Sequence, residues 1–142
     1  MRIEYVIVAV LFLLDQLTKF LARSEVLSGE WIFLVFNSGG SLGLFADSNE
    51  AFIVLSVFAI LLLGYGVVST THPESTGFAV VLAGVLGNGL DRVVFGAVTD
   101  FARFFDLFIF NLADVYITVG VVFLLLLELE WFKQLVSVKK GI

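Results

Sequence analysis

The sequence has 142 residues, of which 60% are hydrophobic and 15% charged, and its mean hydropathy is +1.08. These values exclude a soluble globular domain, because such a domain needs polar side chains over most of its surface. The net charge of −5 comes from scattered carboxylates, and no basic stripe is present, so we expect no nucleic-acid partner. The lack of cysteine excludes disulfides and thiolate metal sites.

Four long apolar segments predict four transmembrane helices. A helix needs about 20 predominantly apolar residues to cross the hydrocarbon core of a bilayer. The sequence therefore predicts an all-α membrane protein, formed as a single integral membrane domain over residues 1–142. We expect its helices at residues 3–22, 51–69, 77–94 and 111–135.

Two connecting segments lie on the same predicted side of the membrane. Residues 23–49 surround the apolar run Trp31–Phe36 with glycine and polar residues, which predicts a small extracytoplasmic β-rich segment between the first two helices. Residues 95–110 are expected to be irregular. Four crossings place both termini on one side. If Lys19 and Arg92 are buried ion-pair partners, the remaining positive charges favour cytoplasmic termini.

Several ionisable residues fall inside or at the ends of the apolar segments. A charged group at the centre of a transmembrane helix costs at least about 2.5 to 3.5 kcal/mol, so each needs a partner or a function. Asp15 and Lys19 are four residues apart and share a helix face, which predicts an ion pair. Asn88, Asp91 and Arg92 lie about one turn apart. They predict either an Asp–Arg network at a helix end or a group in which arginine positions a substrate.

Two further aspartates flank the segment before the last helix. Asp100 stands alone between apolar neighbours, and in isolation it is typical of a solvated turn. Asn111 and Asp114 have the i, i+3 spacing of a helix N-cap and a first-turn acid. However, the short segment between the third and fourth helices allows Asp100 and Asp114 to meet. Two carboxylates that share one water cannot both ionise easily, so one stays protonated while the other acts as a base, as in aspartyl peptidases.

Other chemistries fit the sequence less well. There is no cysteine and no His-Glu-x-x-His helix, and His72, the single histidine, lies in a predicted turn on the side opposite the polar clusters. We therefore expect no metal and no organic cofactor. Two alternatives stay open, since intramembrane Asp, Asn and Arg also form the relays of transporters and channels, or the packing contacts of a noncatalytic assembly subunit.

Five segments in order resemble the lipoprotein signal peptidases (signal peptidase II), almost from end to end. The resemblance implies that Asp100 and Asp114 form a catalytic dyad. It implies that four residues bind substrate or position the dyad, namely Asn37, Asn88, Arg92 and Asn111, and that three are structural supports, namely Asp15, Lys19 and Asp91. The segments are Asp15-Gln-Leu-Thr-Lys19, Asn37-Ser-Gly39 with Gly43-Leu-Phe45, Gly84-Val-Leu-Gly-Asn88-Gly-Leu-Asp91-Arg92, Val98-Thr-Asp100-Phe101 and Phe110-Asn-Leu-Ala-Asp114.

The resemblance also implies a substrate and a location. The expected substrates are diacylglyceryl-modified bacterial prolipoproteins, cut just before the lipidated cysteine. The expected enzyme is a monomer in the lipid of the inner membrane, with its active site near the extracytoplasmic face. One departure concerns Leu42, which stands where the family usually has an aromatic residue. It leaves the catalytic assignment intact, but the substrate preference need not follow that of the family.

Overall fold

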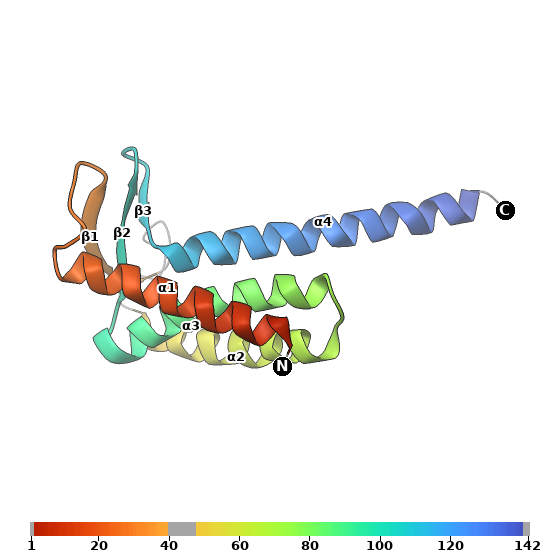
Figure 1. The fold of residues 1–142 in the computed structure, drawn as a ribbon, viewed down its shortest axis with the longest axis horizontal. Coiled ribbons are helices and arrows are strands. Elements are labelled where there is room, and N and C mark those ends of the chain that lie inside the picture. Colours follow the sequence, from red (N-terminus) through yellow and green to blue (C-terminus); the bar gives the residue numbers. More distant parts are fainter. Residues whose placement is uncertain (1, 40–47, 141–142) are drawn as a thin grey trace.

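A computed structural model of the chain describes residues 2–39 and 48–140 and contains four long helices (Figure 1). All four are long and apolar enough to span a membrane, which confirms the prediction of four transmembrane helices. The start of α1 and the end of α4 both lie away from the sheet, and α4 extends well past the other helices (Figure 1). The helices are α1 (Ile3–Arg23), α2 (Asn49–Ser69), α3 (Glu74–Phe95) and α4 (Leu112–Lys140).

α3 and α4 are longer than expected, because polar residues beyond the apolar segments continue each helix. α3 begins at Glu74, directly after Pro73, because proline restricts the residue before it but tolerates a helix after it. α4 extends to Lys140, since no glycine or proline lies between Gly120 and Gly141 to end it. α3 ends at Phe95 because Gly96 follows as its C-cap, with a φ of 74°, the left-handed conformation that glycine adopts without strain.

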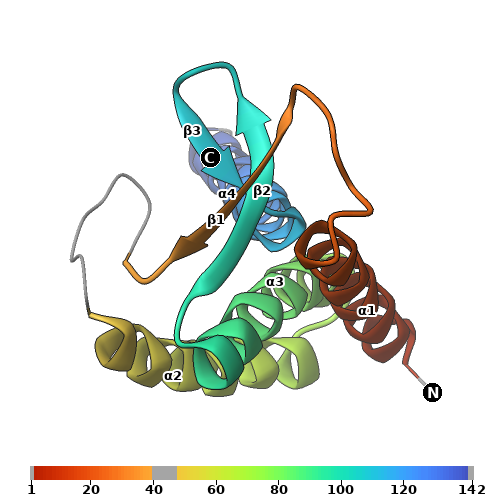
Figure 2. The same ribbon diagram turned by 90° about the vertical axis from the view of Figure 1, so that its left-hand side faces the viewer.

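α3 is the central helix, and the other three pack around it (Figure 2). Small residues allow the close approach of α3 and α4. A Cβ atom added at Gly84 would lie 2.5 Å from the carbonyl oxygen of Ala113, and one at Gly120 would lie 2.6 Å from Cγ2 of Val81. Such contacts are shorter than van der Waals distance, so glycine is required for this packing.

A three-stranded antiparallel sheet of order β1-β2-β3 covers one end of the helices (Figures 1 and 2). β1 (Ile32–Asn37) comes from the segment after α1, which confirms the β-rich segment expected there. β2 (Val98–Phe104) and β3 (Phe108–Phe110) come from the segment expected to be irregular, so that interpretation was wrong. β2 pairs with β1, including Val35 with Asp100, and local sequence does not reveal that pairing. β3 pairs with β2 inside the same segment, as a hairpin. Leu42 lies outside the described residues.

Candidate active site

The two predicted catalytic aspartates line one cavity of about 950 Å³ beneath the sheet. Asp100 is on β2 and is buried, whereas Asp114 is in the first turn of α4 and is partly buried. Asn111 contacts both carboxylates. Its Nδ2 atom donates a hydrogen bond to Oδ1 of Asp100 at 2.6 Å, and its backbone N–H donates to Oδ2 of Asp114 at 3.2 Å. One buried asparagine therefore fixes the two acids relative to each other.

The local structure at Asn111 and Asp114 is a reciprocal cap at the start of α4. The Asp114 backbone N–H donates to Oδ1 of Asn111 at 3.1 Å, while the Asp114 carboxylate accepts the backbone N–H of Asn111. This is the capping-box pattern, and it satisfies N–H groups that the helix leaves without partners. The predicted N-cap is confirmed, and the same geometry presents the Asp114 carboxylate to the cavity.

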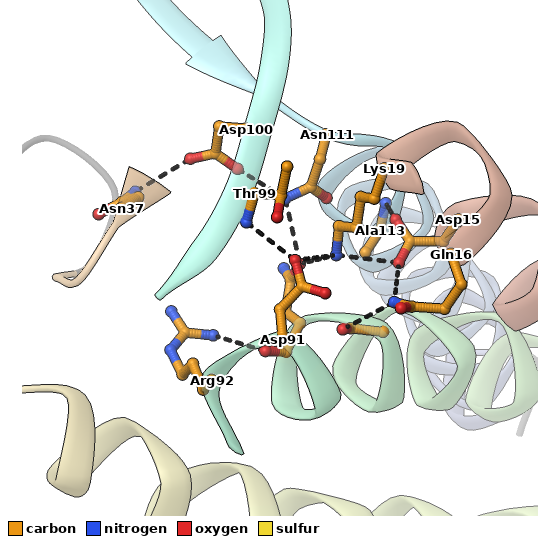
Figure 3. A network of polar contacts seen from close by, with 12 residues as sticks. Asp15, Gln16, Lys19, Asn37, Asp91, Arg92, Thr99, Asp100, Asn111 and Ala113 are labelled. Carbon is orange, nitrogen blue, oxygen red and sulfur yellow. Dashed lines mark hydrogen bonds and ion pairs between the residues drawn. The ribbon is translucent and has the colours of Figure 1, made fainter. Parts of the chain in front are cut away.

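Two more asparagines donate hydrogen bonds to the two aspartates. Asn37, the last residue of β1, donates from Nδ2 to Oδ2 of Asp100 at 3.1 Å (Figure 3). Its Oδ1 atom accepts the backbone N–H of Gly39. Asn88 on α3 donates from Nδ2 to Oδ1 of Asp114 at 2.9 Å. The Oδ1 atom of Asn88 accepts hydrogen bonds from Lys19 and from Asn111, so its amide has a single orientation. The two carboxylates thus accept hydrogen bonds from three asparagines.

A fully buried ion cluster supports this site from the α1 side (Figure 3). The Lys19 ammonium lies 2.9 Å from Oδ2 of Asp15 and 3.6 Å from Oδ2 of Asp91, which confirms the predicted Asp15–Lys19 pair. Asp15 also accepts the Ala113 backbone N–H at 2.9 Å, so it caps α4 next to the dyad. The close approach of Asp15 to α3 requires Gly87, where any Cβ would collide with the Asp15 carboxylate.

Arg92 does not pair with Asp91, contrary to the Asp–Arg network considered from the sequence. Consecutive helix residues point in different directions, so Asp91 faces α1 while Arg92 lines the cavity. The Arg92 guanidinium donates to the carbonyl oxygen of Gly39 at 3.4 Å and lies 4.8 Å from the ring centroid of Phe52 on α2. Arg92 therefore places a cation at the dyad that no neighbouring aspartate neutralises through an ion pair within the described residues.

Arg23 and Thr99 join the buried cluster beside the site, although the sequence interpretation did not select them. Asp91 pairs with Arg23 and not with Arg92, and Nη1 of Arg23 lies 3.6 Å from Oδ1 of Asp91. The same nitrogen donates to Oγ1 of Thr99 at 2.7 Å. A signal for Arg23 existed, since Asp15, Lys19 and Arg23 recur at four-residue intervals on one helix face. No comparable pattern marked Thr99.

The surroundings of Asp100 favour its protonated form more than those of an ordinary aspartate do. Burial raises the pKa of Asp100 to about 6, the hydrogen bond from Asn37 opposes this rise, and the Asp114 charge adds to it. The hydrogen bond from Asn111 and the charge of Lys19 also oppose the rise. Within the described residues, no group of three His, Cys, Asp or Glu side chains is placed to bind a metal ion.

Comparisons with known proteins agree with these features. The family model described as "Signal peptidase (SPase) II" matches residues 7–130. A lipoprotein signal peptidase of Caldicellulosiruptor bescii is 36% identical over 137 residues, covering 90% of this chain and 91% of that protein. One of Anaplasma phagocytophilum is also 36% identical, covering 94% and 96%. A solved bacterial membrane enzyme has a TM-score of 0.81 at 24% identity, covering 89% of this chain and 87% of its own.

The fold and the cavity define a multi-pass membrane protein with an acidic site at one end of its helices. The family model, which matches most of the chain, identifies a particular family within this class. The chain belongs to the signal peptidase II family, the lipoprotein signal peptidases, and it is a protease that processes lipoproteins.

Proposed function

We propose that the protein is an aspartyl endopeptidase that removes the signal peptide of diacylglyceryl-modified prolipoproteins, just before the lipidated cysteine. Asp100 and Asp114 are the proposed catalytic residues. The observation that carries this proposal is the bridge by Asn111, whose side chain and backbone donate to one carboxylate each within a single cavity. This arrangement matches the requirement for two acids that share one water and one proton.

The proposed reaction begins with a water held between the two carboxyl groups. The ionised carboxylate accepts a proton from the water as its oxygen attacks the scissile carbonyl carbon, while the protonated carboxyl donates its proton to the carbonyl oxygen. Collapse of the tetrahedral intermediate transfers a proton to the leaving nitrogen. The products are the signal peptide carboxylate and a free amino group on the lipidated cysteine. Burial of Asp100 favours its carboxyl as the group that carries the proton before substrate binds.

The lining of the cavity supports the proposed substrate class. Apart from the dyad, Asn37, Asn88 and Arg92 provide polar groups, and we propose that they hold the scissile backbone or position the dyad. The remainder is mainly apolar and aromatic, as an acylated peptide arriving from the bilayer requires. This apolar part includes Phe33, Phe105, Leu107, Phe108 and Phe110.

We further propose that the enzyme is a monomer in the bacterial inner membrane, with cytoplasmic termini and the sheet at the extracytoplasmic face. The even number of spans and the position of the sheet opposite the start of α1 and the end of α4 support this orientation. Signal peptides remain in the membrane after export of the mature part, so cleavage at the outer surface suits such a substrate. This orientation also allows water to reach the dyad without crossing the bilayer.

The test of the function is cleavage of a purified prolipoprotein by the detergent-purified enzyme, with the products identified by mass spectrometry. We expect hydrolysis of the bond before the diacylglyceryl-modified cysteine. The matched control is the same precursor without the lipid, for which we expect no product. A cut at another bond, or equal rates for both precursors, would contradict the proposed specificity.

The raised pKa of Asp100 predicts a pH dependence of cleavage. A carboxyl with a pKa of about 6 keeps its proton to a higher pH than an ordinary aspartate, and the dyad loses activity when that proton leaves. We therefore expect kcat/KM to decrease as the pH rises through about 6, with an apparent pKa that belongs to the pair. Asn37→Ala removes a hydrogen bond that favours the ionised form, so its decrease should occur at a higher pH. A decrease at the wild-type pH or below would contradict this account.

A further inference from the structure

β2 presents two neighbouring residues to opposite sides of the sheet, because side chains alternate along a strand. Asp100 faces the cavity, and Thr99 is fully buried on the side of α1 and α3. The aim of Asp100 therefore depends on how firmly the strand is fixed at Thr99. The backbone N–H and the hydroxyl group of Thr99 both have hydrogen-bond partners outside the sheet.

Asp91 fixes the backbone of Thr99, and Arg23 fixes its side chain. The Thr99 backbone N–H donates to Oδ2 of Asp91 at 2.9 Å (Figure 3). The Thr99 hydroxyl accepts a hydrogen bond from Nη1 of Arg23 at 2.7 Å. Because α3 supplies the aspartate and α1 supplies the arginine, the two helices hold this strand at one residue.

Arg23 is itself held in place at the end of α1. Its guanidinium lies 3.6 Å from Oδ1 of Asp91 and 4.4 Å from the ring centroid of Phe95, and its side chain is 19% exposed. A planar guanidinium with a carboxylate, a hydroxyl and an aromatic ring as neighbours has little freedom to rotate. Contacts with α1 and α3 therefore determine where the Thr99 hydroxyl lies, in addition to the pairing of the sheet.

We propose that the Arg23–Thr99 contact is a positioning element of the active site, which aims Asp100 at the shared water and at Asp114. This inference rests on the proposed function, since it requires Asp100 to take part in catalysis. Neither residue lines the cavity, so neither touches substrate. Displacement of a catalytic group by about 1 Å costs up to about 10²-fold in rate, which sets the size of the expected effect.

The test compares Thr99→Val, which keeps the shape but loses the hydroxyl, with Thr99→Ser, which keeps the hydroxyl. We expect Thr99→Val to lower kcat by about 10- to 10²-fold with little change in KM, and Thr99→Ser to recover most of the loss. Arg23→Gln should lower kcat similarly, and the Arg23→Gln/Thr99→Val double variant should be no slower than the slower single variant, because both act through one contact. Thr70→Val is the control, since it removes a hydroxyl hydrogen bond to Gly66 far from the sheet and should leave kcat unchanged.

The outcomes separate this inference from the proposed function. The unfolding midpoint of each variant is measured in the same detergent as its kcat. A loss of kcat with an unchanged midpoint supports a positioning role. Wild-type kcat in Thr99→Val, equal losses in the valine and serine variants, or multiplicative losses in the double variant would overturn the inference. Asp100→Asn is measured in the same series. If it stays active, the dyad itself is wrong, whereas an inactive Asp100→Asn beside a fully active Thr99→Val rejects the Arg23–Thr99 contact alone.

Discussion

Asp100→Asn and Asp114→Asn are each expected to lower kcat by about 10² to 10⁴-fold, because each removes one partner of the proton transfer to or from the attacking water. The substitution keeps the size of the side chain, and an amide cannot accept or release the proton. We expect the double variant to be no slower than the slower single variant, since the two acids act as a unit. The measurement is single-turnover cleavage of the lipid-modified precursor, which isolates the chemical step from product release.

Asp106→Asn is the matched control for these variants. Asp106 lines the same cavity, but it is 87% exposed and pairs with Arg103 at the turn between β2 and β3. Surface ion pairs of this kind contribute little, so we expect kcat to stay within about twofold of the wild type. A folded Asp100→Asn or Asp114→Asn variant that cleaves at the wild-type rate would reject the dyad. A transporter or an assembly subunit would show no cleavage by the wild type either.

The elements that local sequence could predict are the ones fixed by local interactions. The four helices follow from apolar length alone, and the Asp15–Lys19 pair follows from i, i+4 spacing. Asn111 and Asp114 form their cap within one helical turn, so the i, i+3 spacing was sufficient to bring them together. In these cases the partners are close in the chain, and periodicity determines which side chains meet.

The elements that local sequence could not predict depend on partners distant in the chain. The N-terminal half of β2 pairs only with β1, more than 60 residues away, and residues 95–110 alone do not reveal that pairing. The exchange of Arg92 for Arg23 as the partner of Asp91 has the same origin, since α1 approaches the inner face of α3. The hydroxyl of Thr99 meets Arg23, which is distant in the chain, and its backbone N–H meets Asp91 of the preceding helix, so nothing in its own segment marked it.

The charged residues around the dyad form one connected group, so a residue outside the dyad can be essential for stability. Lys19 joins Asp15, Asp91 and Asn88, and Asn88 in turn donates to Asp114. Within the described residues, the Lys19 ammonium is the only cation that contacts two of these carboxylates and an amide. Removal of this charge leaves two fully buried aspartates with Arg23 as their one remaining ion-pair partner there.

Lys19→Met is therefore expected to lower the free energy of unfolding by about 3 to 5 kcal/mol, because it keeps the apolar stem and leaves buried carboxylates uncompensated. The measurement is equilibrium unfolding in mixed detergent micelles. Lys133→Met is the control, since it removes an exposed pair with Glu130 and should leave stability unchanged. Adding Asp15→Asn to Lys19→Met should recover part of the loss, because it removes one unpaired charge. If Lys19→Met is as stable as the wild type, or the second substitution weakens it further, uncompensated charge is not what the lysine prevents.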